Sequence, residues 1–474
     1  MHKIAIMDKR YFKTDNVIYK IMFILSCVAV AYCFLTLYYV DLILIAEYGY
    51  EYADHVLTGR IVEFLNNATW SYGISLFTIF AIWSIPVWLY FKLFNIPVDL
   101  NQTGVYLWYK LLVLLFVIWS VYIVARIAGE VYPKFKRMIV LNYLSSTLLV
   151  FPAIAICQCD IIGLCFVLLG IFYFMRNNTR AFLISFAIAC TMKYFALFVF
   201  LPLLLLKFKK IKQIICGAFA GGSLIFVSLI IQSFSEVGGN YLQDPEGDLN
   251  KFYITALSNF SLERGDRGDL IGMLGVALAI VLIMAYLTHI ENDQDRKKYA
   301  IWYATAGYFV FFLNYPANTY WFCLIAPLML LLAYTNINNI GLNLILEVIY
   351  ALSVFISKIY IQKYVLFGPK AYAYLLLKRY ANTIPEDINM ITKVIDRICP
   401  FDFTKILPTI IGIGFACAIM FMIINFPASE RFIVRRLLKS EDEENKEILV
   451  ISGMRILILY IWIGISIITL LKYN

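Results

Sequence analysis

The sequence predicts an all-α, polytopic integral membrane protein, and three observations support that prediction. Hydrophobic residues occupy 62% of the 474 positions and charged residues only 15%, whereas soluble domains carry about 25% charged residues. The apolar residues fall into runs close to the length that a helix needs to cross a bilayer, about 20 residues. Most lysines and arginines stand in short clusters between these runs.

The apolar runs predict about thirteen membrane-spanning helices. The first run follows a basic start and is too long for the apolar part of a cleavable signal peptide, so we expect it to remain as a span with a cytoplasmic N-terminus. The expected spans are residues 17–40, 104–126, 138–154, 160–176, 180–193, 194–207, 211–232, 269–290, 299–313, 319–335, 340–361, 405–426 and 449–472.

The basic clusters predict the orientation of these helices. Cytoplasmic loops carry an excess of lysine and arginine, so the clusters near residues 126–137, 176–180, 207–212, 296–298 and 431–439 are expected inside. Residues 41–103 then form a long first outer loop. Its apolar segment from Ser71 to Phe94 must not span, because otherwise residues 126–137 would lie outside. We therefore expect interfacial helices in this loop.

The same orientation divides the chain into three parts. Residues 1–232 form a first membrane module, residues 233–268 a polar outer loop with an acidic balance, and residues 269–474 a second, more variable membrane module. Within the second module, the stretch KAYAYLLLKRY (370–380) is typical of an amphipathic helix lying on the membrane.

Polar residues interrupt the apolar stretch from Phe151 to Lys210. Gln158 and Asp160 stand between two apolar runs, and Lys193 lies in a third. A charge at mid-bilayer costs roughly 2.5–3.5 kcal/mol, so such residues usually face a protein interior or a water-filled cavity. We expect short helices that carry a polar site near the outer membrane face. The alternative is a connecting loop and a lysine that reaches the interface.

The order of features in this stretch resembles that of type C glycosyltransferases (GT-C). Those proteins show roughly a proline, then Gly-Gln-x-Asp, a lysine and a second proline; here Pro152, Gln158, Asp160, Lys193 and Pro202 follow in that order. Cys157 stands where glycine is usual. The resemblance implies transfer of a sugar from a polyprenyl-phosphate carrier to an acceptor at the external membrane face.

The resemblance also implies a general base, an aspartate in the first outer loop. Asp54, Arg60 and Glu63 lie in EYADHVLTGRIVEFL with spacing similar to that of the family, so we expect Asp54 to be the catalytic base. Asp41 is the second candidate, but it directly follows the first apolar run and is interpreted as the end of that helix. A solvated amphipathic helix is the alternative for the Asp54 segment.

Other residues are expected to bind the donor. Lys193 matches the family's lysine and is the first candidate for the donor phosphate, with Arg60, Arg264 and Arg267 as further cations. Substrate-binding roles are expected for Gln158 and Asp160 and for Tyr320 and Trp321, which lie in NYPANTYWFCLIAPLML. An ordinary aromatic belt at the membrane interface is the alternative for that aromatic pair.

The expected function is an inverting hexosyltransferase that uses a polyprenyl-phosphate sugar and a glycan, lipid-linked or protein acceptor in the cell envelope. The alternatives are a transporter or flippase, or a polymerase, of lipid-linked saccharides. The net charge of +9 comes from topology signals and predicts no nucleic-acid partner. The three histidines are dispersed and Cys157-x-Cys159 has no histidine nearby, so no metal site is predicted. No cofactor is firmly implied, and a divalent cation stays open.

Overall fold

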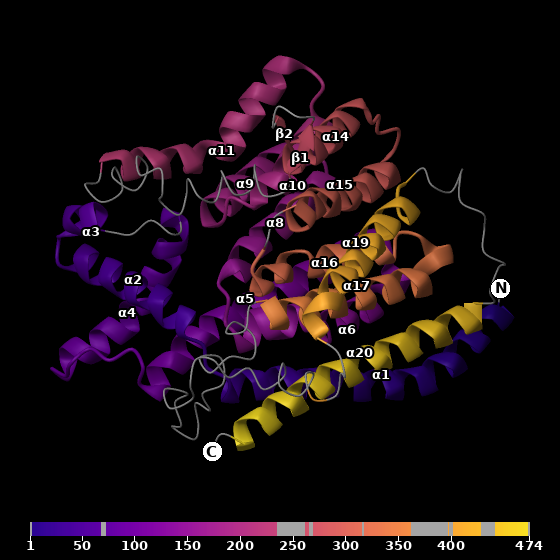
Figure 1. Ribbon diagram of the computed structural model, residues 1–474, viewed down its shortest axis with the longest axis horizontal. Helices are drawn as coiled ribbons and strands as arrows, with labels where there is room; N and C mark the ends of the chain where they lie inside the picture. The colour runs from indigo at the N-terminus through magenta and orange to yellow at the C-terminus, as the bar shows by residue number, and fades with distance from the viewer. Residues whose placement is uncertain are drawn as a thin grey trace.

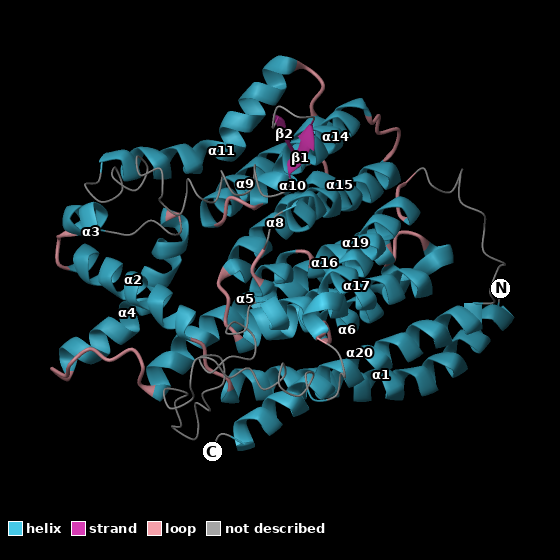
Figure 2. Ribbon diagram, in the orientation of Figure 1, coloured by secondary structure: helices cyan, strands magenta, loops and turns pink. Residues whose placement is uncertain are grey.

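The computed structural model describes residues 2–67, 73–234, 261–264, 269–314, 317–361, 397, 402–427 and 441–472. Helices dominate this part of the chain, as Figure 2 shows. The predicted helix over residues 370–380 lies outside the described residues, as does Arg267. The described residues confirm a helical membrane architecture and differ from the prediction in the number and length of the helices.

The helices alternate with short 3₁₀ and π segments. In chain order they are α1 (His2–Thr36), α2 (Val40–Leu57), α3 (Ile61–Asn67), α4 (Ile74–Leu93), α5 (Thr103–Val131), η1 (Pro133–Phe135), α6 (Lys136–Leu144), α7 (Thr147–Leu149), η2 (Val150–Ala155), α8 (Asp160–Met175), α9 (Thr179–Met192), α10 (Ala196–Lys207), α11 (Ile211–Phe234), α14 (Met273–Leu287), α15 (Asp293–Asn314), η3 (Thr319–Leu324), α16 (Ala326–Ala333), η4 (Ile337–Asn339), α17 (Ile340–Ile361), η8 (Phe403–Ile406), α19 (Leu407–Ile424) and α20 (Glu441–Lys472).

Seven helical segments among the described residues are long and apolar enough to cross a membrane, or eight if the bent pair 133–144 and 147–155 forms one span. They lie at Val17–Thr36, Ile74–Leu93, Thr103–Val131, Ile211–Ile231, Ile337–Ser357, Phe403–Ile424 and Asn445–Ile467. The chain is therefore a multi-pass integral membrane protein, and the expectation of about thirteen spans is wrong. Helix α4 is one of these seven segments. Length and composition alone do not place a helix relative to the membrane, so the expected place of α4 in the outer interface stays a prediction.

The missing spans have identifiable physical causes. The expected spans at 160–176, 180–193, 194–207 and 269–290 correspond to α8, α9, α10 and α14, which have 16, 14, 12 and 15 residues. At 1.5 Å per residue these helices reach only about 18–24 Å. A turn with Asn177 at φ 56° separates α8 from α9, and an extended Lys193 ends α9.

A small hairpin is the exception to the all-helical prediction. Strand β1 (Ser261–Arg264) pairs with β2 (Asp269–Gly272) in antiparallel register, so that Arg264 stands opposite Asp269. The hairpin lies in the predicted outer loop 233–268 and just beyond it. It precedes α14 directly.

Figure 1 shows how the helices gather. Helices α1 and α20 run side by side along the lower edge of the view, and α2, α3 and α4 lie together at its left end. Helices α2 and α4 pack closely because Gly49 has no side chain: a Cβ atom there would lie 2.5 Å from Cβ of Phe80. The segment between α1 and α5 is therefore a packed helical unit.

Helix α4 is in turn fixed to α5 and α9. The rings of Trp83 and Trp108 stack at 4.5 Å, and each indole N–H donates to the other residue's carbonyl at 2.9 Å. At the start of α4, a Cβ atom on Gly73 would lie 1.7 Å from the carbonyl oxygen of Thr191. This close approach brings the start of α4 to the end of α9, next to Lys193.

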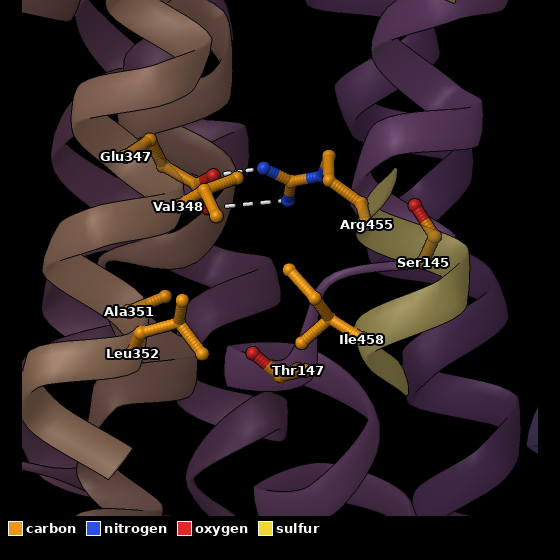
Figure 3. Close-up of a pocket in the computed structure, with 8 residues that line it drawn as sticks. All are labelled: Ser145, Thr147, Glu347, Val348, Ala351, Leu352, Arg455 and Ile458. Atoms are coloured by element: carbon orange, nitrogen blue, oxygen red, sulfur yellow. Dashed lines mark hydrogen bonds and ion pairs between the residues drawn. The ribbon is translucent and has the colours of Figure 1, made fainter. Parts of the chain in front are cut away.

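A buried ion pair connects the last helix to the core (Figure 3). The Arg455 guanidinium group on α20 binds the Glu347 carboxylate on α17 through two nitrogens and also donates to the carbonyl of Asn142 at 3.2 Å. Both charged side chains are at most 4% exposed. Beside them lies a small cavity of about 20 Å³, lined by Ser145, Thr147 and apolar residues of α17 and α20.

Candidate functional site

The segment that leads into α8 adopts an unusual backbone. Pro152 lies in the π-helical turn η2, and Cys157 has φ 59°, in the left-handed region that glycine adopts without steric cost. A non-glycine residue therefore adopts a conformation that suits glycine directly before Gln158.

Gln158 and Asp160 are buried at the start of α8, where they are 1% and 3% exposed. The Gln158 Oε1 atom accepts from the Cys159 N–H at 3.1 Å, which fixes the orientation of the amide. Among the described residues, Gln158 Nε2 and Asp160 Oδ2 have no hydrogen-bond partner. Buried polar atoms are rarely left unpaired, so these two atoms offer one donor and one acceptor to water or a ligand.

Lys193 meets Asp160 directly. Its ammonium nitrogen lies 3.3 Å from Asp160 Oδ1, and 5.4 and 5.3 Å from the ring centroids of Phe195 and Trp321. The Asp160 side chain is 1% exposed and the Lys193 side chain 18%. Lys193 thus covers one side of the buried Asp160 carboxylate. Its ammonium group also lies near the rings of Phe195 and Trp321 and stays partly exposed.

Asp41 is the third charged member of this group. It lies in the first turn of α2, after the short link that follows α1. Burial raises the pKa of Asp41 to about 6, while the positive charge of Lys193 opposes this rise and the negative charge of Asp160 adds to it. Among the described residues no side chain donates a hydrogen bond to the Asp41 carboxyl group. The charges of Lys193 and Asp160 thus act on Asp41, and this electrostatic group joins α2 to α8 and the end of α9.

Tyr320 and Trp321 border the same group. They belong to η3, and the Tyr320 hydroxyl accepts from Asn318 Nδ2 at 2.8 Å. Burial raises the pKa of Tyr320, and the negative charges of Asp41 and Asp160 raise it further. The predicted residues Asp160, Lys193, Tyr320 and Trp321 are thus brought together, although they come from well-separated parts of the sequence.

Asp54 belongs to a different cluster. Its Oδ2 atom accepts from Arg60 Nη2 at 2.8 Å, its Oδ1 atom accepts from the Trp88 indole N–H at 2.7 Å, and Lys92 lies 3.4 Å away. Burial alone would raise the pKa of Asp54, but the hydrogen bonds from Trp88 and Lys92 and the charges of Lys92 and Arg60 lower it. Arg60 also lies 3.6 Å from Glu63.

Asp54, Arg60 and Glu63 thus interact with one another, and Asp54 also contacts α4. The role of Asp54 as a base stays a prediction. The residue that sequence reasoning set aside is Asp41, and the available signal was its place directly after the first apolar run. Arg264 stands opposite Asp269 in the hairpin.

No group of three or more histidine, cysteine, aspartate or glutamate residues that could hold a metal ion occurs within the described ranges. The candidate site consists of the carboxylates of Asp41 and Asp160, the ammonium group of Lys193 and the neighbouring aromatic rings. Comparisons with family models, with curated proteins and with solved structures find no match to this chain.

Proposed function

We propose that this membrane protein is a GT-C-like glycosyltransferase that moves a sugar from a polyprenyl phosphate to a glycan, lipid-linked or protein acceptor. The observation that carries the proposal is the group formed by Asp41, Asp160 and Lys193, with aromatic residues at its border. Such a transfer needs a base for the acceptor hydroxyl, a cation for the leaving phosphate and a surface for the sugar. The group contains one candidate for each.

Asp41 replaces Asp54 as the proposed base. A general base works best when its pKa lies near the operating pH, and the pKa of Asp41 is raised to about 6. No described side chain donates a hydrogen bond to its carboxyl group, so its oxygens are available to an acceptor hydroxyl. Asp54 is bound by Arg60, Trp88 and Lys92, and its lowered pKa makes it a weaker base.

Lys193 is the proposed ligand of the donor phosphate. A cation held beside a departing phosphate stabilises the charge that develops on the leaving oxygen, and a partly buried position strengthens this effect. Asp160 occupies one side of the ammonium group and orients it. Trp321 and Tyr320 would offer ring faces to the sugar, as aromatic residues often do for ligands with apolar faces.

The test is a transfer assay with purified protein and defined polyprenyl-phosphate hexoses, with and without EDTA. We expect Asp41→Asn to lower transfer by about 10²–10⁴-fold, the usual contribution of a positioned base, while donor binding is retained. Lys193→Met is expected to weaken donor binding. Asp54→Asn is the matched control, because it makes the same change in the same helix, α2, and should retain most activity.

The possible outcomes separate the alternatives. If Asp54→Asn abolishes transfer and Asp41→Asn does not, the base is Asp54 as the sequence pattern predicted. If no hexose is transferred but vesicles containing the protein move the lipid-linked sugar across the bilayer, the protein is a flippase. Formation of long saccharide chains from a lipid-linked repeat unit would instead identify a polymerase.

A further inference from the structure

Helix α5 carries a buried lysine that the proposed reaction does not use. Lys110 is 1% exposed, and no carboxylate among the described residues pairs with it. A buried ammonium group is expensive in a membrane protein unless it is satisfied by polar partners. Lys110 and Tyr106, which lies one turn before it on α5, contact the two chain segments that carry the proposed catalytic group.

Lys110 binds the end of the first long helix. Its ammonium group donates to the carbonyl oxygens of Cys33 at 2.8 Å and Leu37 at 2.5 Å. Helix α1 ends at Thr36, and the last carbonyls of a helix lack intrahelical partners and carry the negative end of its dipole. The positive charge of Lys110 therefore binds carbonyls at the negative, C-terminal end of α1. This fixes the chain four residues before Asp41.

Tyr106 holds the next part of the same segment. Its hydroxyl oxygen accepts from the backbone N–H of Tyr39 at 2.9 Å and donates to the carbonyl of the same residue at 3.2 Å. Tyr39 stands two residues before Asp41. One hydroxyl thus binds both polar groups of a backbone unit at the entrance to α2.

Both side chains also meet the segment that precedes α8. The Tyr106 hydroxyl lies 4.0 Å from the Cys157 sulfur, and the Lys110 ammonium group interacts with the same thiol. Cys157 directly precedes Gln158. Residues i and i+4 project from the same face of a helix, so one face of α5 contacts the segment before Asp41 and the segment before Asp160.

We infer that Tyr106 and Lys110 are positioning residues that hold Asp41 at a fixed place relative to Gln158 and Asp160. The inference rests on the proposed function, since it concerns the geometry of that reaction. Displacing a catalytic group by about 1 Å can lower a rate by about 10²-fold. Burying the polar side chains of Tyr106 and Lys110 at this point can therefore benefit the reaction, even though apolar side chains would be buried at a lower cost in free energy.

The experiment compares Tyr106→Phe and Lys110→Met with Tyr109→Phe. Tyr109 is a matched control because it is buried in the same helix, and its hydroxyl bonds to Ser84 on α4 at 2.7 Å instead of to the segment before Asp41. We expect kcat for sugar transfer to fall by about 10- to 100-fold in the first two variants. The donor Kd should stay within about twofold, because Lys193 is untouched. Tyr109→Phe should keep both values.

Hydrogen–deuterium exchange supplies a readout that does not need activity. The Tyr39 N–H loses its acceptor in Tyr106→Phe, so amide exchange in residues 37–41 should accelerate there and stay unchanged in Tyr109→Phe. Unchanged kcat and unchanged exchange in both test variants would overturn the inference, as would an equal loss of activity in the control. If the unmodified protein transfers no sugar, the proposed function fails while the exchange experiment still decides whether the two residues hold this segment.

Discussion

Replacing Asp41 by asparagine is expected to stabilise the protein while it removes the proposed base. Burial raises the pKa of Asp41 from 3.8 to about 6. One pKa unit corresponds to 1.36 kcal/mol, so keeping this carboxylate ionised in the folded protein costs about 3 kcal/mol. Asparagine has nearly the same shape and no charge, so it avoids this cost. Stability and activity should therefore change in opposite directions.

The sign of the effect defines a pH window. The folded protein holds the Asp41 proton more tightly than the unfolded chain, so the contribution of this group to stability is fully present below pH 3.8 and is lost as the pH rises through about 6. The two proteins should have similar stability near pH 4. Above pH 6 the asparagine variant should be more stable by up to about 3 kcal/mol. Thermal unfolding in detergent at pH 4, 5, 6 and 8 measures the growing difference.

Asp54→Asn is the control with the opposite sign. The pKa of Asp54 is lowered, despite its partial burial, by the hydrogen bonds from Trp88 and Lys92 and by the charges of Lys92 and Arg60. Its ionised form therefore stabilises the folded protein above the unfolded pKa, and asparagine should reduce stability at pH 8. The reasoning is refuted if Asp41→Asn lowers stability at pH 8, or if both variants change it in the same direction.

Two further predictions concern stability. Arg455→Met leaves the buried Glu347 carboxylate uncompensated and should destabilise the protein by about 3–5 kcal/mol, whereas Glu347→Leu combined with Arg455→Met should recover most of that loss; a double variant that unfolds more easily than the single one in a thermal melt would contradict this. Cys157→Gly should be tolerated, whereas Cys157→Val should lower the melting temperature because a β-branched residue is strained at φ 59°; equal melting temperatures would show that this backbone angle imposes no constraint.

Composition and the apolar runs were sufficient to predict a helical membrane protein, but they did not show which of its helices are long enough to cross a membrane. The breaks at residues 176–180 and at Lys193 were predicted, and the expected segments 160–176, 180–193 and 194–207 agree closely with α8, α9 and α10. Residues 319–335 looked like a span and form instead a 3₁₀ segment followed by the eight-residue helix α16. Apolar helices packed inside the protein need not cross the bilayer, and hydropathy does not distinguish the two cases.

Sequence reasoning named Asp160, Lys193, Tyr320 and Trp321, which the structure brings together, because polar and aromatic residues at the ends of apolar runs are informative. Their roles in binding and the choice between Asp54 and Asp41 as the base stay predictions. Asp54 was favoured over Asp41 because of a spacing pattern. That pattern reports a local ion-pair cluster on α2, α3 and α4, whereas the neighbours of Asp41 come from distant segments. The local spacing around Asp41 does not show which distant segments lie near it.

The short helices have a consequence for substrate access. Helix α8 starts at the candidate site and ends at Met175, next to Arg176. Helix α9 returns from Thr179 to Met192, next to Lys193, and α10 runs away again to Lys207. The basic residues therefore lie at the ends opposite the site, and the positive-inside rule predicts that the site opens outward. Helices of 16, 14 and 12 residues reach about 18–24 Å, less than the 30 Å hydrocarbon core. A site at their outer ends would lie about 6–12 Å below the outer edge of that core if the basic ends are at the inner edge. A site at this depth would suit the proposed donor, which arrives along the bilayer on a lipid carrier, better than a donor that diffuses from solution.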